Sequence, residues 1–236
     1  MEKNTNSRYF LLGILFVVAI VAYVLSMQKG VVEIVETKSE DDFVKITIQI
    51  PKLKNTRDID LENQFNNMIQ DKLKAIVEDV KSMAQEAAND DMLHGKYEVH
   101  ISTQVKYQSR DFVSLVMYYY TFTGGAHGNT IIETYNLDLS TNKIITLKDI
   151  FNSNCDYETI IKEEILKQIE ERMTDFFEES IEYVKNENIS ERTFTISKDG
   201  LEIYYQDYEI APHSSGLPVF KIDITKIRNC LKYNLK

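Results

Sequence analysis

The 236-residue sequence has few of the residues, and none of the motifs, on which the commonest enzyme sites depend. It has two cysteines without a Cys-x-x-Cys pair, and its four histidines form no His-Glu-x-x-His motif. No Gly-x-Ser-x-Gly motif occurs, and its glycine-rich loop lacks the lysine and the following helix of a phosphate-binding loop. From the motifs we therefore predict no catalytic residue, no metal site and no cofactor, and we expect a protein that is not an enzyme.

The chain also has a shortage of positive charge. It carries 37 Asp and Glu residues against 27 Lys and Arg, a net charge of −10. The first 27 residues contribute +1, which leaves −11 on the remainder. Negative charge repels nucleic acid and attracts basic molecules over long range. The charge therefore excludes nucleic acid as the expected partner and favours a basic protein.

Near the N-terminus, Tyr9–Gln28 contains no charged residue and follows Lys3 and Arg8. A helix of about 20 apolar residues spans a hydrocarbon core, and preceding positive charges favour a cytoplasmic N-terminus. We predict a short cytoplasmic tail at 1–8 and a transmembrane signal-anchor at 9–28. The expected location is the cell membrane, single-pass, with an extracellular C-terminal domain. A cleaved signal peptide is the alternative.

The rest of the chain shows the mixed periodicities of an α+β domain. We assign residues 29–42 to a linker, 43–95 to an N-terminal β-α lobe and 96–235 to a C-terminal α+β lobe. Continuous apolar stripes predict long helices from Leu61 to Asn89 and from Asp156 to Val184. The strands cluster in hairpins, so the predicted fold is an antiparallel sheet with two long helices packed on it, preceded by the transmembrane helix.

Period-two alternation locates the strands between these helices. The predicted strands are Phe43–Ile50, Tyr97–Tyr107, Phe112–Phe122, Ile131–Leu139, Ile144–Leu147, Phe194–Ser197, Leu201–Tyr208 and Val219–Asp223.

Two loops rich in small residues are the candidates for function. Glycines make the first of them costly to order on folding, and tyrosines beside small residues are typical of protein-binding surfaces. The predicted partner-binding residues are Tyr120, Thr123, Gly124, Gly125, Ala126, His127, Gly128, Asn129, Ala211, Pro212, His213, Ser214, Ser215 and Gly216.

Two residue pairs leave alternatives open. His127 and His213, one in each loop, would form a zinc or acid–base site if a carboxylate joined them, but loop histidines bonded to nearby backbone are the favoured interpretation. Cys155 and Cys230 either form one disulfide or are two buried free thiols, because the sequence does not show whether they approach each other.

The run YYYTFTGGAHGNTIIETYNLDLSTNKIITLKDIF and the later APHSSGLPVF together resemble a known domain. It is the extracytoplasmic domain of the lysozyme-sensing anti-sigma-V factor family, which also accompanies exported peptidoglycan deacetylases. The resemblance covers about residues 31–235 and implies a domain that binds lysozyme over its active-site cleft. The short tail at 1–8 departs from the longer sigma-binding segment of that family, and the sequence shows no deacetylase domain.

We therefore expect a membrane-anchored extracytoplasmic protein that binds lysozyme, or another basic wall hydrolase, and acts as an inhibitor or decoy. The first alternative is a cell-wall module that binds peptidoglycan through its tyrosines. A less favoured alternative is a metal-dependent wall enzyme that uses His127 and His213.

Overall fold

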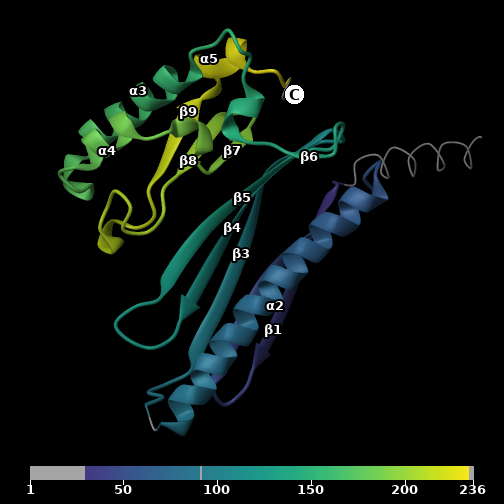
Figure 1. Ribbon diagram of the computed structural model, residues 1–236, viewed down its shortest axis with the longest axis vertical. Helices are drawn as coiled ribbons and strands as arrows, with labels where there is room; N and C mark the ends of the chain where they lie inside the picture. The colour runs from purple at the N-terminus through teal and green to yellow at the C-terminus, as the bar shows by residue number, and fades with distance from the viewer. Residues whose placement is uncertain (1–29, 91, 234–236) are drawn as a thin grey trace, which may run out of the picture.

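The computed structural model describes residues 30–90 and 92–233, which form a mixed α+β fold (Figure 1). The predicted signal-anchor at 9–28 lies outside the described residues. In the part of the chain that the structure describes, no helix is both long enough and apolar enough to cross a membrane.

A long six-stranded sheet forms the first half of the fold, in the order β1-β2-β3-β4-β5-β6. All neighbouring strands are antiparallel except β2 and β3, which are parallel. The prediction of a purely antiparallel sheet is wrong at this pair, because the intervening helix α2 (Ile59–Asn89) carries the chain back to the end where β2 began. The strands are β1 (Val32–Glu40), β2 (Val44–Leu53), β3 (Tyr97–Gln108), β4 (Phe112–Phe122), β5 (Asn129–Asp138) and β6 (Lys143–Ile144).

Strand β1 corrects the predicted linker at 29–42. It is held by backbone pairing with β2, from Val32 opposite Leu53 to Glu40 opposite Lys45. Its side chains are exposed or half-buried throughout. A polar edge strand leaves no alternating apolar signal, so the sequence pattern does not reveal it.

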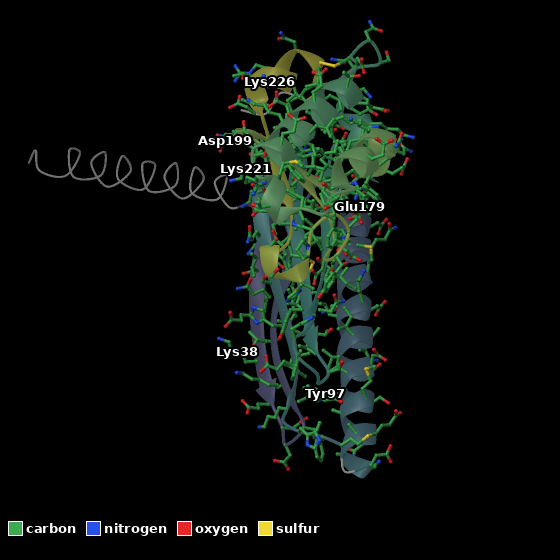
Figure 2. The ribbon with its side chains drawn as sticks, turned by 90° about the vertical axis from the view of Figure 1, so that its left-hand side faces the viewer. Lys38, Tyr97, Glu179, Asp199, Lys221 and Lys226 are labelled. Carbon is green, nitrogen blue, oxygen red and sulfur yellow. A yellow bond between two sulfur atoms is a disulfide. The ribbon has the colours of Figure 1, made fainter. Side chains whose placement is uncertain are left out.

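Helix α2 covers one face of the long sheet as a separate layer, as the turned view shows (Figure 2). Asp58 caps its N-terminus by accepting hydrogen bonds from the backbone N–H groups of Asp60 and Leu61 at 2.8 and 3.1 Å. The predicted apolar stripe is confirmed and packs on buried residues of β2 to β5. Its buried members are Phe65, Ile69, Leu73, Val80, Ala84 and Ala87.

The second half of the chain builds a separate core on a three-stranded sheet in the order β7-β8-β9. Helix α3 packs its buried Ile161, Ile165 and Ile169 into this core. The elements are the strands β7 (Phe194–Ser197), β8 (Gly200–Tyr204) and β9 (Val219–Asp223), the helices α3 (Tyr157–Glu170), α4 (Ser180–Asn186) and α5 (Ile224–Ile227), and the 3-10 turns η1 (Leu147–Ile150), η2 (Met173–Asp175), η3 (Ile189–Glu191), η4 (His213–Ser215) and η5 (Arg228–Cys230).

The second predicted helix, from Asp156 to Val184, is wrong as a single element. Helix α3 ends at Glu170. Phe176 stacks on Phe220 of β9 with ring centroids 5.7 Å apart, and the backbone N–H of Phe177 donates to the Ile210 carbonyl at 3.0 Å. These long-range contacts require a non-helical backbone at Phe176 and Phe177, although the helical spacing of apolar residues continues there.

The two halves are joined through buried polar and apolar contacts between their sheets. The Ser114 hydroxyl donates to Asn136 Oδ1 at 2.6 Å, and Asn136 Nδ2 donates to the Phe194 carbonyl at 2.9 Å. The backbone N–H of Ile196 donates in turn to the Ser114 hydroxyl at 3.0 Å. The long sheet runs unbroken across the predicted lobe boundary at 95/96, so the change from one core to the other falls later in the chain, after β5.

Cys155 and Cys230 form a disulfide, with Cα atoms 5.5 Å apart. The bond ties the segment before α3 to η5 near the C-terminus of the described chain. The neighbouring helix α5 lies at the end of the second half opposite the loop between β8 and β9 (Figure 1).

Candidate binding site between two loops

The fold brings the two predicted loops together. The β4–β5 connection presents His127 and the β8–β9 connection presents His213, and the two imidazole rings stack with centroids 4.1 Å apart and planes 16° apart. Tyr208 joins them, with its ring centroid 5.9 Å from that of His213 and 6.3 Å from that of His127. We call His127, Tyr208 and His213 the ring cluster.

The first loop reaches this position because of its glycines. Gly124 and Gly125 have φ angles of +93° and +91°, which glycine adopts without strain. Gly128 is buried against β4, where a Cβ atom would lie 2.4 Å from the Tyr120 ring and 2.6 Å from the Thr121 carbonyl oxygen. The absence of a side chain at Gly128 therefore lets the loop fold back onto Tyr120 and present His127.

The second loop begins with a turn at Gln206–Glu209 that is clamped at both ends. At one end, the Gln206 side chain bonds both backbone groups of Ile132 on β5 at 2.9 Å, as a neighbouring strand would. At the other end, Glu209 Oε2 accepts the backbone N–H of Gln206 at 2.8 Å. Between them Tyr208 has a φ of +60° and is 55 % exposed. A left-handed, exposed tyrosine is costly to maintain, which makes the turn a candidate site.

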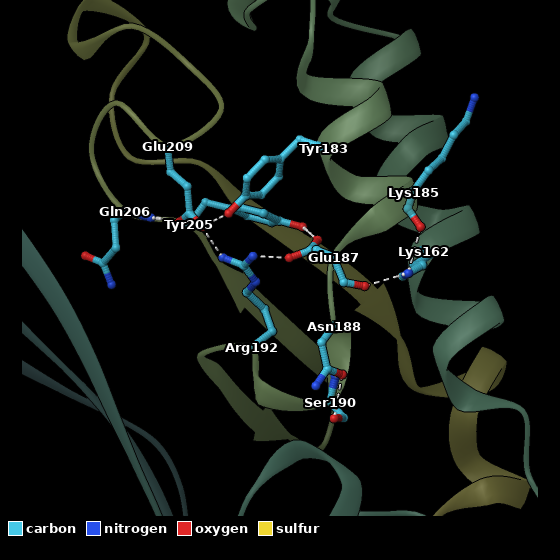
Figure 3. A network of polar contacts seen from close by, with 10 residues as sticks. All are labelled: Lys162, Tyr183, Lys185, Glu187, Asn188, Ser190, Arg192, Tyr205, Gln206 and Glu209. Atoms are coloured by element: carbon cyan, nitrogen blue, oxygen red, sulfur yellow. Dashed lines mark hydrogen bonds and ion pairs between the residues drawn. The ribbon is translucent and has the colours of Figure 1, made fainter.

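A charged network beneath this turn holds Glu209 in place (Figure 3). Arg192 donates to Glu209 at 2.6 Å and pairs with Glu187, and its guanidinium lies 4.1 Å from the centroid of the Tyr205 ring. The Tyr183 hydroxyl also donates to Glu209, at 2.8 Å. Because Arg192 contacts both carboxylates, the network fixes the turn to α4 and the segment that follows it.

The network also determines the charge states of its members. Burial opposes the charge on Arg192, yet Glu209 and Glu187 outweigh it and raise the pKa of Arg192. Burial likewise favours protonation of Glu209, but the bonds from Arg192, the Gln206 backbone and Tyr183 hold the pKa of that carboxyl below its ordinary value. Both groups are therefore charged near neutral pH, and a member left unpaired would be costly.

Asp207 and His213 form a carboxylate–imidazole pair at the edge of the ring cluster. The Nδ1 atom of His213 lies 2.6 Å from Asp207 Oδ2, and the Asp207 side chain is only 5 % exposed. The second carboxylate oxygen, Oδ1, is buried without a hydrogen-bond partner in the part of the chain that the structure describes. On the facing ring, His127 Nδ1 lies 2.8 Å from the Gly128 carbonyl oxygen and Nε2 lies 3.3 Å from the Tyr208 hydroxyl.

The ring cluster does not have the geometry of a metal site. Among the described residues, no group of three or more His, Cys, Asp and Glu side chains could hold a metal ion. A metal bound by two imidazoles lies close to the plane of each ring, and rings stacked 4.1 Å apart at 16° offer no such common position. The arrangement is suited instead to contacts with a flat or hydroxyl-bearing ligand, because it combines ring faces with hydrogen-bonding groups.

The predicted site residues differ in how exposed they are in the structure. Residues 123–127, Asn129 and residues 214–216 are exposed, and Tyr120, Pro212 and His213 are half-buried, whereas Gly128 and Ala211 are buried. Three residues of the candidate site were not predicted: Asp207 and Tyr208 in the turn, and Arg192 beneath it. The predicted strand Leu201–Tyr208 is wrong after Tyr204, because continued aromatic spacing concealed the turn that Asp207 favours.

Comparison with known proteins divides the chain into two matched segments. Residues 37–130 match the family described as deacetylase PdaC, and residues 148–225 match DUF3298, described as a protein family of unknown function. His127 lies in the first segment, and Asp207, Tyr208 and His213 lie in the second. The ring cluster is therefore assembled across both segments.

One curated relative is the peptidoglycan-N-acetylmuramic acid deacetylase PdaC of Bacillus subtilis strain 168, which is 23 % identical over 209 residues. The match covers 87 % of this chain and only 43 % of the relative, so the chain spans less than half of that protein's length.

Two solved structures share the fold. A DUF3298 family member from Bacteroides fragilis superposes with a TM-score of 0.61 at 20 % identity, over 87 % of this chain and 95 % of the other. A DUF3298 family protein from Pseudomonas aeruginosa gives a TM-score of 0.57 at 18 % identity, over 87 % and 96 %. The PdaC family match and the PdaC relative support the deacetylase side of the predicted resemblance and do not support its anti-sigma-V side. The chain thus combines a PdaC-like segment with a DUF3298-like segment.

Proposed function

We propose that this protein is a non-catalytic cell-wall module that binds the glycan of peptidoglycan through the ring cluster. The observation that carries the proposal is the stacked group of His127, Tyr208 and His213, held between two loops with Tyr208 55 % exposed. An aromatic face packs against the C–H face of a sugar, while the hydroxyl and imidazole nitrogens reach its polar groups. The cost of the left-handed Tyr208 is consistent with such a role.

The relationship to a protein named as a peptidoglycan deacetylase supports the same target. The name describes the activity of the whole relative, and this chain matches only 43 % of that protein. For this chain we propose that it binds the wall and does not catalyse deacetylation. The disulfide supports an extracytoplasmic location, since disulfides persist in oxidising compartments. Membrane anchoring through residues 9–28 remains part of the proposal.

The test is co-sedimentation of the purified protein with insoluble peptidoglycan. We expect binding by the natural protein and a loss of affinity of about tenfold or more in Tyr208→Ala, because about 1.4 kcal/mol of ring contact is removed. Ile144→Ala is the matched control, since Ile144 is similarly exposed at 58 % but lies on β6. Failure of the natural protein to sediment with the wall, or equal binding by Tyr208→Ala, contradicts the proposal.

Binding of lysozyme is the second candidate function, and a separate surface supports it. An open pocket of about 610 Å³ beside α4 combines the exposed carboxylates of Glu179 and Glu182 with the exposed Tyr183 ring, which suits a basic side chain of a basic partner. Its lining residues are Glu179, Glu182, Tyr183, Asn186, Glu187, Asn188 and Arg192.

A lysozyme arm of the same experiment separates the two candidates. Salt-sensitive capture of lysozyme that is lost in Glu179→Gln/Glu182→Gln, but retained in Tyr208→Ala, would favour the second candidate over the first.

A further inference from the structure

The tautomer of His213 decides whether the ring cluster offers a hydrogen-bond acceptor, and its role rests on the proposed function. Asp207 Oδ2 lies 2.6 Å from Nδ1 of His213, and the Asp207 carboxylate is almost fully buried, with a side chain 5 % exposed. A carboxylate accepts hydrogen bonds and donates none, so Nδ1 carries the proton in this contact. In a neutral imidazole the other nitrogen, Nε2, is then a hydrogen-bond acceptor.

His127 is fixed in the same way by different partners. Its Nδ1 lies 2.8 Å from the Gly128 carbonyl oxygen, which can only accept, so Nδ1 of His127 is also the donor. Its Nε2 is left to accept the Tyr208 hydroxyl at 3.3 Å. The acceptor nitrogen of His127 is thus engaged within the ring cluster, while no contact to Nε2 is described for His213, whose side chain is 39 % exposed.

Asp207 also bears a cost that simple packing does not explain. Its Oδ1 atom is buried and has no hydrogen-bond partner among residues 30–90 and 92–233, and a buried oxygen without a partner loses its hydration without compensation. An aspartate kept at such a position is expected to serve the one partner that it does contact. That partner is His213.

We propose that Asp207 is a positioning residue that holds His213 with Nε2 as the acceptor for a neutral donor that cannot accept in turn, an amide N–H of a wall glycan. A proton on Nε2 turns this acceptor into a donor and adds positive charge to a ring stacked 4.1 Å from His127. Binding therefore falls when the imidazole takes up a proton. In the described contacts, the titratable groups that face His213 are Asp207, Tyr208 and His127.

The direct test is nitrogen NMR of the histidine side chains of the full protein at pH 7.5. We expect His213 to show the Nδ1–H tautomer in the natural protein and to lose this preference in Asp207→Asn, whose amide offers a donor as well as an acceptor. An Nε2–H tautomer or a doubly protonated ring in the natural protein at this pH overturns the inference, whatever the protein binds.

The functional test is co-sedimentation with insoluble peptidoglycan between pH 5 and 8, the range in which imidazoles titrate. We expect affinity to fall about tenfold or more as the pH falls. Asp207→Asn should weaken binding at pH 7.5 by about ten- to a hundredfold, as changes to groups that orient a histidine do. His94→Gln, a change at an exposed histidine before β3, should keep the natural pH profile.

The outcomes separate this inference from the proposed function. Absence of wall binding by the natural protein at every pH contradicts the proposed function. Binding that is independent of pH, or stronger in acid, overturns only the role of His213. A circular dichroism melt of each variant excludes unfolding as the cause of a loss.

Discussion

At the scale of single residues, the site depends on positions where the backbone has little freedom to change. Tyr208 occupies a left-handed conformation, and Gly128 lies where a side chain does not fit. Each position acts on one imidazole of the ring cluster through the backbone. Gly128 sets the loop that bears His127, and Tyr208 lies in the turn that precedes His213. Substitutions at such positions act through geometry and leave the two cores intact.

Gly128→Ala tests this dependence. The added Cβ would lie 2.4 Å from the Tyr120 ring, so the loop must move away from β4. We expect a loss of about 1 to 3 kcal/mol in the free energy of unfolding, and displaced NMR signals for the His127 side chain. Gly95→Ala is the control for the His127 signals only, because it adds the same methyl group where nothing lies within 4 Å but at a φ of +125°, where an alanine is itself strained. Unchanged His127 signals in Gly128→Ala would show that the loop position does not depend on this contact.

At the scale of elements, the turn at Gln206–Glu209 is the part of the site that the rest of the fold holds most firmly. Gln206 completes the edge of β5, and Glu209 is bound by Arg192 and Tyr183 (Figure 3). Arg192 is 13 % exposed and compensates two carboxylates. The conformation of the turn therefore depends on a cation that lies outside it in the sequence.

Arg192→Met should be strongly destabilising. It keeps much of the side-chain volume but leaves Glu187 and Glu209 buried without a cation, and losses of about 3 to 5 kcal/mol are typical when one partner of a buried ion pair is removed. Urea denaturation measures the change. Lys221→Met is the matched control, because Lys221 is 79 % exposed and 3.9 Å from Glu202, a geometry that contributes about 1 kcal/mol or less. A loss below about 1 kcal/mol in Arg192→Met would contradict the role of the network.

At the scale of the whole molecule, two large hydrophobic cores are joined by a smaller buried cluster of Val116, Ile132 and Tyr204, and the ring cluster lies where loops from the two halves meet. The disulfide belongs to the second half, where the neighbouring helix α5 lies at the end opposite the β8–β9 loop (Figure 1). Stability and binding are therefore separable in this fold. A change at the disulfide should lower the stability of the protein and leave its binding unchanged.

Reduction of Cys155–Cys230 tests this separation. The bond spans 75 residues, and cross-links over loops of this size contribute about 2 to 4 kcal/mol. We expect a lower melting temperature in reductant or in Cys155→Ser/Cys230→Ser, with wall binding unchanged at temperatures where the protein remains folded. Loss of binding by a folded, reduced protein would show that the disulfide also positions the loops.

Local sequence pattern predicted the regular elements well. The bounds of β4, β7 and β9 match their predicted ranges, and α2 has the predicted apolar stripe. Both candidate loops were also evident, because clustered glycine, proline and small residues mark turns wherever they occur. Pattern failed where a contact from another part of the chain decided the local structure. Examples are the edge strand β1 and the break after Glu170.

By itself the sequence determined the α+β class, the burial faces of β2, β3 and α2, the acidic charge and the two loops, because periodicity and composition are local properties. Only the tertiary structure decided that His127 and His213 stack, that Asp207 orients one of them, and that Arg192 holds the turn between. These residues come from segments that no local pattern connects. Their meeting is a consequence of how the two sheets pack.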